Sequence, residues 1–164
     1  MQRNEMNSIV IGIGEYFVSD EPSDVIKTYA LGSCVAVIMF DKIKKVAGLV
    51  HIALPDSMIS VEKKNNLPGY FADTGIFTLL EEMKKKGANL RDIWIKIIGG
   101  ANVLHTEYKF DIGIRNVLAI KKILWRVNLG VIAEDIGGKI ARTCILNVGT
   151  GEITISSNNN KWKI

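Results

Sequence analysis

The residues best suited to chemistry are a cysteine and a histidine on two neighbouring predicted strands. Cys34 follows a Leu31-Gly32-Ser33 turn and precedes an apolar run from Val35 to Phe40. A second apolar run, Val46 to Leu54, contains His51. Runs rich in β-branched and aromatic residues predict buried strands. The short polar connection between them predicts an antiparallel hairpin.

The register of this hairpin decides whether the two side chains meet. If the turn is centred between Lys42 and Ile43, Cys34 lies directly opposite His51. Opposite residues share a face, with Cβ atoms roughly 4.5 to 5.5 Å apart, so thiol and imidazole could form a hydrogen bond. A neighbouring imidazolium would lower the pKa of the thiol from its usual value of about 8.5. A slip of one residue would separate the two side chains.

Residues before Cys34 could complete a catalytic site. Thr28 lies six positions earlier, on the segment Asp24 to Ala30 that enters the turn. Its hydroxyl could accept the other imidazole N–H and fix the tautomer, as the third member of a triad does. Gly32 and Ser33 are the candidates for turn or oxyanion support, where the amide of Cys34 or of its neighbour would donate. The competing interpretation is structural, because a reduced cysteine beside valines in a strand is usually core.

Several segments in a fixed order carry a family resemblance. They include LGSCVAV and GLVHIALPDS, in which the histidine follows the cysteine by 17 positions. They continue through PGYFADTGIFTLLEEMKKKGA, IKIIGGANV, FDIGIRNVLAIKKIL and VIAEDIGGKIAR. Together these segments closely resemble the chemoreceptor glutamine deamidase family, CheD, over nearly the whole chain. The resemblance implies that Cys34 is the nucleophile, His51 the general base and acid, and Thr28 the orienting group.

The same resemblance implies a fold and a reaction. The fold would be α+β, a layered α/β sandwich of two packed mixed sheets flanked by helices, similar to certain toxin deamidases. The reaction would convert receptor glutamine to glutamate through a thioester, with chemoreceptor cytoplasmic helices as substrate and without a cofactor. Two alternatives remain open. The chain could act chiefly as a binding partner of the chemotaxis phosphatase CheC, or it could be another thiol enzyme, a protease or a transglutaminase.

Further candidates lie outside the hairpin. Asp56 and Ser57 open a long polar loop, Pro55 to Gly69, that starts just after His51 and is a candidate substrate loop. Gly99 and Gly100 end a predicted strand, where bare amides could approach the substrate or simply turn the chain. The resemblance implies that the neighbourhood of the LHTEYKFD segment docks CheC, although this segment differs in length from the family pattern. Its apolar residues Leu104 and Phe110 are the partner-binding candidates. His105 in that segment is expected on a surface loop.

Composition limits the class of protein. A chain of 164 residues that is 48% hydrophobic fits one domain, residues 1–164, with a sizeable core. Its apolar runs are far shorter than the ~18 residues of a membrane span, and the start MQRNEMNS lacks signal-peptide features, so we expect a cytoplasmic protein. Two cysteines without CxxC spacing predict no metal site. The net charge of +4 comes from lysines at turns and helix ends, which argues against nucleic-acid binding.

Periodicity predicts the remaining elements. Ile76, Leu79, Leu80 and Met83 share one face of a helix over Phe71–Lys86, which Asp73 or Thr74 would cap and Gly87 would end. A second helix is expected over Ile114–Val127. The remaining expected strands are Ile9–Val18, Asp92–Ile98, Val131–Glu134, Ile140–Val148, which contains a core Cys144, and Glu152–Ser156. The tail, residues 158–164, is expected to fray.

Overall fold

A computed structural model describes residues 6–105 and 107–164, which form two five-stranded sheets and three α-helices. The first sheet contains β1 (Asn7–Val10), β3 (Asp24–Leu31), β8 (Arg142–Asn147), β9 (Ile153–Ser157) and β10 (Asn160–Lys163), in that order. The second contains β2 (Tyr16–Ser19), β5 (Val46–Ile52), β4 (Val35–Asp41), β6 (Ile93–Gly99) and β7 (Val131–Ile136). The helices are α1 (Val61–Asn66), α2 (Ala72–Lys85) and α3 (Ile112–Arg126).

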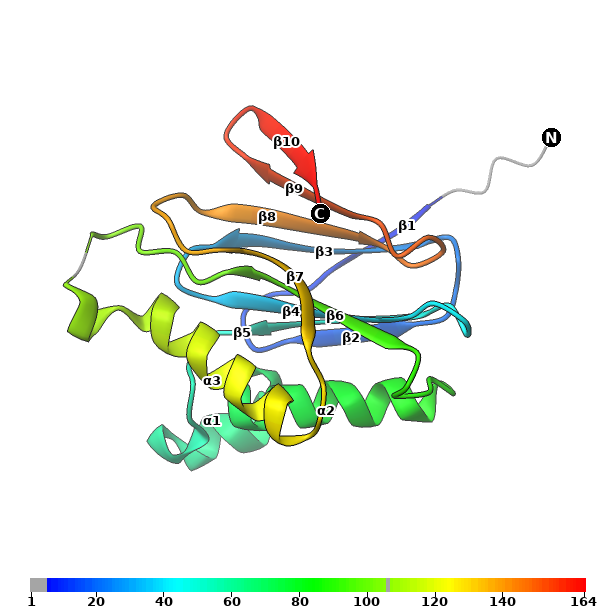
Figure 1. The fold of residues 1–164 in the computed structure, drawn as a ribbon, viewed down its shortest axis with the longest axis horizontal. Coiled ribbons are helices and arrows are strands. Elements are labelled where there is room, and N and C mark those ends of the chain that lie inside the picture. The colour runs from blue at the N-terminus through cyan, green and yellow to red at the C-terminus, as the bar shows by residue number, and fades with distance from the viewer. Residues whose placement is uncertain (1–5, 106) are drawn as a thin grey trace.

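The two sheets stack face to face, and α2 and α3 cover the outer side of the second sheet (Figure 1). Both sheets are mixed, because β1 pairs with β3 and β6 with β7 in parallel while the other neighbours are antiparallel. This arrangement confirms the expected α+β class with two packed mixed sheets. Both long helices lie on one side, so the second sheet is the middle layer.

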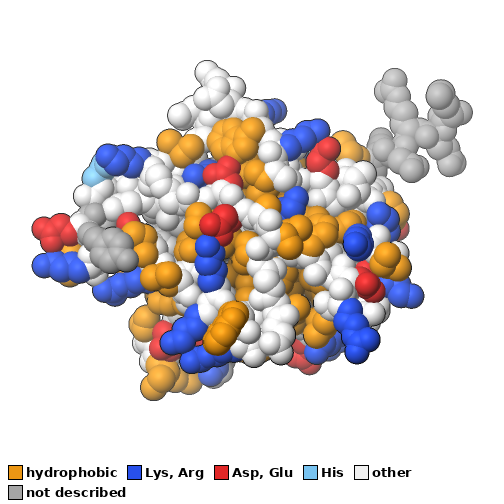
Figure 2. All heavy atoms as spheres, in the orientation of Figure 1, with side chains coloured by type: hydrophobic (Ala, Val, Ile, Leu, Met, Phe, Trp, Pro, Cys, Tyr) orange, Lys and Arg blue, Asp and Glu red, His pale blue; other side chains and the backbone are white. Residues whose placement is uncertain are grey.

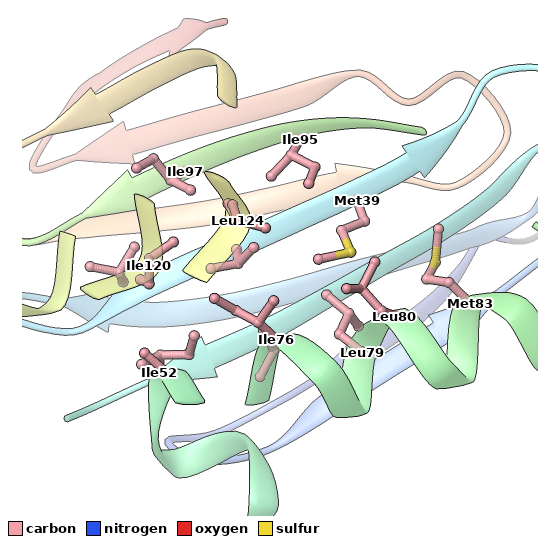
Figure 3. Close-up of a cluster of buried hydrophobic side chains, with 14 of the residues drawn as sticks. Met39, Ile52, Ile76, Leu79, Leu80, Met83, Ile95, Ile97, Ile120 and Leu124 are labelled. Carbon is pink, nitrogen blue, oxygen red and sulfur yellow. The ribbon is translucent and has the colours of Figure 1, made fainter. Parts of the chain in front are cut away.

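The hairpin strands β4 and β5 are buried on both faces because they belong to that middle layer. Alternate residues such as Val37 and Met39 face α2 and α3, where they meet Ile76 and Leu79 (Figure 3). The residues between them, such as Ile38, pack against the first sheet. Burial on both faces explains why these strands read as continuous apolar runs rather than as alternating ones.

The strongest predicted helix is present, but its predicted cap is wrong. The four apolar residues expected on one face of α2 are buried, and Gly87 ends the helix with a φ of +91°. Phe71 occupies the N-cap without a side-chain hydrogen bond. The carboxylate of Asp73 instead accepts from the amide and hydroxyl of Ser57. Asp73 is therefore used to hold the preceding loop.

Three other expectations are corrected by the structure. The segment Ile9–Val18 is not one strand, because it crosses from β1 in the first sheet to β2 in the second through a turn at Gly14, whose φ is +80°. The loop Pro55–Gly69 contains the short helix α1, which the prolines and the weak period concealed. The tail does not fray, since β10 pairs with β9 from Asn160 to Lys163.

Two surface properties bear on possible partners. No helix within the described ranges is long and apolar enough to cross a membrane. On the face drawn in Figure 2, Lys and Arg side chains are interspersed with acidic and hydrophobic ones instead of forming one continuous basic track. This distribution is typical of a solvated mixed surface.

Candidate active site

The β4–β5 hairpin differs in register from the prediction by two residues. His51 lies opposite Ala36, and the connection occupies the four residues between Asp41 and Val46. The carboxylate of Asp41 accepts from the amides of Ile43 and Lys44, which fixes this longer turn. Because strand side chains alternate, a shift of two residues keeps them on their faces. His51 therefore stays on the face between the sheets, one position diagonal from its predicted partner Cys34.

Thr28 and His51 join the two sheets through a buried hydrogen bond. The Thr28 Oγ1 on β3 lies 2.7 Å from Nδ1 of His51 on β5. The same hydroxyl donates to the carbonyl of Ile11 at 2.9 Å. A hydroxyl has one proton, so Thr28 must accept from Nδ1–H, which assigns the proton of the neutral imidazole to Nδ1. The Nε2 atom is left with a free lone pair.

The environment of His51 keeps the imidazole neutral. The residue is 1% exposed, and burial lowers the pKa of His51 from 6.5 to about 4. Its Nε2 is buried and has no hydrogen-bond partner among the described residues. An unpaired buried acceptor is unfavourable and calls for an explanation, and a general base awaiting a proton is one.

Cys34 lies just before β4, partly buried against the core between the sheets. Burial raises the pKa of the Cys34 thiol, an effect that its own backbone amide opposes. The predicted lowering by an imidazolium is thus wrong for this state, because His51 is uncharged near neutral pH. The predicted hydrogen bond between the thiol and the imidazole is also absent from the described structure. The diagonal register accounts for this absence, since the imidazole faces Ala36 directly.

The turn that carries Cys34 is held by backbone contacts with the end of β6. The Gly100 amide donates to the Cys34 carbonyl at 2.8 Å, and the Ala101 amide donates to the Gly32 carbonyl at 2.8 Å. A Cβ atom on Gly99, whose φ is +117°, would lie 2.2 Å from the Cys34 carbonyl oxygen. Gly99 and Gly100 therefore support the turn that carries Cys34 by close backbone approach, and Gly32 takes part in the same contacts.

One further polar residue contacts this turn and was not predicted from the sequence. Asn116 on α3 is fully buried, and its Nδ2 donates to the carbonyls of Ser33 at 3.0 Å and Ala53 at 2.9 Å. The sequence held a signal, because this asparagine precedes Val117 on the apolar side of a predicted helix. A polar residue at such a position is expected to have buried partners.

The other candidates lie around the turn or away from it. Ser57 is buried against Asp73 as described above, and the exposed Asp56 accepts from the Met58 amide to cap a short 3-10 turn. Neither forms a hydrogen bond with Cys34, His51 or Thr28 in the part of the chain that the structure describes. The sequence placed these two near the site only through their position in the chain after His51.

The partner-binding candidates border a small cavity beside the turn that carries Cys34. Leu104 and Phe110 are 85% and 60% exposed. With Ser33 and Asp111 they help to line a cavity of about 130 Å³. His105 is exposed in the same loop and has no catalytic contact in the described structure.

Cys144 is fully buried, as expected of a core residue, and burial raises its pKa to about 12. Within residues 6–105 and 107–164, no three His, Cys, Asp or Glu side chains gather as a metal site would require.

Comparison with known proteins agrees with the resemblance seen in the motifs. A probable chemoreceptor glutamine deamidase CheD from Syntrophotalea carbinolica is 46% identical over 97% of this chain and 100% of its own. The chemoreceptor glutamine deamidase CheD of Thermotoga maritima is 45% identical over 89% of each chain. A solved structure, the hypothetical protein YfiH from Bacillus licheniformis, matches 73% of this chain and 49% of its own at 14% identity, with a TM-score of 0.44.

A family model, CheD chemotactic sensory transduction, matches residues 53–157. That match begins just after the hairpin, whereas the alignments with whole relatives extend over most of the chain. From both lines of comparison, the chain belongs to the CheD family.

Proposed function

We propose that this protein is a cytoplasmic protein-glutamine deamidase that acts on the side-chain amides of chemoreceptor helices. Relatives at 46% and 45% identity are named as such deamidases. The observation that carries the proposal is the buried pair of Thr28 and His51, which leaves the Nε2 lone pair free on the face that Cys34 shares. A thiol nucleophile, an oriented base and nearby backbone amides are the groups that acyl transfer requires.

The first half of the reaction forms a thioester. Cys34 begins as a thiol and His51 as a neutral imidazole, so Nε2 takes the thiol proton as sulfur attacks the amide carbon. The C–S bond forms, the amide C=O becomes an oxyanion, and the Cys34 amide is the candidate donor to it. The intermediate then collapses, the C–N bond breaks, and Nε2–H gives its proton to the departing nitrogen. Ammonia leaves, and the glutamyl group stays on sulfur.

The second half uses the same base on water. Nε2 takes a proton from water as its oxygen attacks the thioester carbonyl, and the C–S bond breaks. The proton returns to sulfur, which leaves glutamate on the substrate and regenerates the thiol. The low pKa of His51 makes its protonated form a stronger acid than an ordinary imidazolium, which favours proton delivery to the leaving group. Approach of substrate would close the gap between thiol and imidazole, as catalytic hydrogen bonds often tighten only in the complex.

A second role, as a partner of the chemotaxis phosphatase CheC, is favoured by the apolar border of the cavity beside Ser33. Leu104 and Phe110 expose large side chains there, and exposed apolar side chains clustered around a hollow are typical of docking surfaces. A protein seated on this border would lie beside the turn that carries Cys34. Binding of CheC and access of substrate to the thiol would then influence each other.

The reaction can be tested with a purified receptor cytoplasmic fragment, an added primary amine and the intact protein. A deamidase releases ammonia and converts glutamine to glutamate without changing the length of the fragment, which peptide mass spectrometry resolves. A protease would shorten the fragment, and a transglutaminase would attach the amine. The control is the same protein alkylated with iodoacetamide. Absence of ammonia release and conversion, both with and without CheC, would refute the enzymatic proposal.

A further inference from the structure

The side chain of Asn116 connects the two segments that carry the thiol and the imidazole. Its Nδ2 donates to the carbonyl of Ser33, which directly precedes Cys34, and to the carbonyl of Ala53, which follows His51 by two residues. Both partners are carbonyl oxygens and can only accept, so the orientation of the amide is fixed by its contacts. One planar group on α3 thus holds both segments at once.

The contact with Ser33 also sets the direction of the Cys34 amide. In a planar trans peptide, the C=O of one residue and the N–H of the next point in opposite directions. With the Ser33 carbonyl held by Asn116, the Cys34 N–H is turned away from α3. Among the described residues this N–H donates to no backbone carbonyl and instead interacts with the thiol of its own residue. The group proposed to stabilise the oxyanion is therefore aimed by Asn116 and lies on the side of the thiol, where a tetrahedral oxyanion would form.

The contact with Ala53 fixes the end of β5. The Ala53 amide donates to the Tyr70 carbonyl at 2.9 Å, while its carbonyl accepts from Asn116. The backbone of His51 forms two hydrogen bonds with the β1–β2 connection. Its amide donates to the Glu15 carbonyl, and its carbonyl accepts from the Gly14 amide. Asn116 thus connects this strand end directly to the turn that carries Cys34.

The residue is not an optimal choice for packing alone. The Oδ1 of Asn116 is buried and has no partner among the described residues, which is unfavourable for folding. Its neighbours on the buried side of α3, Val117 and Ile120, are apolar. Departures from good packing chemistry are expected where a residue has a functional task.

We propose that Asn116 is a positioning residue, which sets the spacing between Cys34 and His51 and orients the Cys34 amide. The effect on turnover rests on the proposed deamidase activity, whereas the effect on the thiol needs only that His51 acts as a base toward Cys34. The first test is therefore the alkylation rate of Cys34 by iodoacetamide at neutral pH, followed by peptide mass spectrometry. The buried Cys144 serves as an internal control for local or global unfolding.

A double-mutant cycle separates positioning from simple stabilisation. In the wild-type background, Asn116→Leu keeps a branched shape of similar size and removes the donor, and we expect alkylation of Cys34 to slow by about tenfold. In a His51→Ala background the same change should alter the rate by less than about twofold, because the base that Asn116 aligns is gone. An equal effect in both backgrounds, or no effect in either, would overturn the proposal.

The second test is turnover on the receptor fragment. Asn116→Leu should lower kcat by about 10- to 100-fold while KM changes by less than about twofold, since alignment rather than substrate contact is lost. The matched control is Ser19→Ala, which removes another buried hydrogen bond, from Ser19 Oγ to Asp24 at 2.6 Å, between the end of β2 and the start of β3. None of Cys34, His51 and Thr28 takes part in this hydrogen bond. This control should lower the melting temperature and leave kcat unchanged.

A fallback variant keeps the proposal falsifiable if Asn116→Leu does not fold. Asn116→Ser retains one donor and should give a smaller loss of both alkylation rate and kcat; wild-type values for this variant would overturn the proposal. If the wild-type protein has no deamidase activity, the proposed function fails, and the alkylation cycle still decides the role of Asn116.

Discussion

The Thr28 hydroxyl and the His51 imidazole, 2.7 Å apart, connect the two sheets of the sandwich and leave Nε2 as the free nitrogen. Replacing Thr28 with valine keeps the shape but leaves Nδ1–H and the Ile11 carbonyl without their partner. We expect a loss of about 1 to 3 kcal/mol in the free energy of unfolding. Activity should fall by about tenfold or more, because the ring can adopt the other tautomer. Thr28→Ser retains the hydroxyl and should therefore keep most of the stability and most of the activity. Urea unfolding would measure the first, and deamidation rates the second. Equal activity of the valine and serine variants would contradict this role.

Burial of His51 predicts an unusual acid limb for catalysis. A base with a pKa of about 4 remains unprotonated down to that pH, so kcat/KM should decline near pH 4 to 5 instead of near 6.5. The check is the pH profile of deamidation at low substrate concentration, with folding verified at each pH by circular dichroism. An acid limb centred near pH 6.5 would contradict a buried neutral base.

The lowered pKa of His51 also couples its protonation to unfolding. Between about pH 4 and 6.5 the unfolded chain binds a proton at this site that the folded chain does not. The free energy of unfolding should therefore fall as the pH drops through this window, with a contribution of about 3 kcal/mol from His51. Urea unfolding of wild type and His51→Gln at several pH values isolates this contribution, since the carboxylates titrate in both. If the free energies of unfolding of wild type and His51→Gln changed with pH in parallel, a contribution from His51 would be ruled out.

We predict that Gly99 is indispensable because it has no side chain. A methyl group there would collide with the Cys34 carbonyl oxygen, and the φ of +117° is strained for any other residue. Gly99→Ala should destabilise the fold by more than about 3 kcal/mol or displace the turn that carries Cys34. Gly87→Ala is the matched control, because Gly87 also has a positive φ but nothing within 4 Å of the added Cβ. That variant should lose only about 1 kcal/mol and keep full activity. Similar losses in the two variants would show that backbone strain alone is responsible.

The apolar border of the cavity beside Ser33 predicts that CheC binding can be weakened without loss of stability. Leu104→Asp and Phe110→Asp should weaken binding of purified CheC by about tenfold or more, with no change in melting temperature, since both side chains are exposed. Trp125→Asp is the control, because Trp125 is 78% exposed on α3 and does not line this cavity. Calorimetric titration would measure the affinities. A larger effect from Trp125→Asp than from the cavity variants would move the docking surface to α3.

Much of the fold was predictable because burial leaves a clear periodic signal. The helix over α2 and the strands β4 to β6 followed from apolar spacing, and Cys144 is buried as expected. The crossing between β1 and β2 was not predictable from periodicity, because a chain that changes sheets keeps the same alternation of apolar residues. This crossing places the Ile11 carbonyl against Thr28 and the Gly14 and Glu15 backbone against His51.

The residues of the candidate site could be named from the sequence, but their geometry could not. The register of the hairpin depended on Asp41, whose side chain holds a turn two residues longer than the one assumed. The charge state of the pair depended on burial of His51, which local sequence does not reveal. Asn116 acts across more than sixty residues of sequence on both segments, so only the tertiary structure identifies its partners.

The most direct test of the central claim compares the two cysteines of the chain. Cys34→Ala and Cys144→Ala each remove one thiol, and mass spectrometry of a receptor cytoplasmic fragment measures conversion of glutamine to glutamate. We predict that Cys34→Ala abolishes conversion, while Cys144→Ala retains it with a lowered melting temperature, because Cys144 is only a core residue. Full conversion by a folded Cys34→Ala variant would contradict the assignment of Cys34 as the nucleophile.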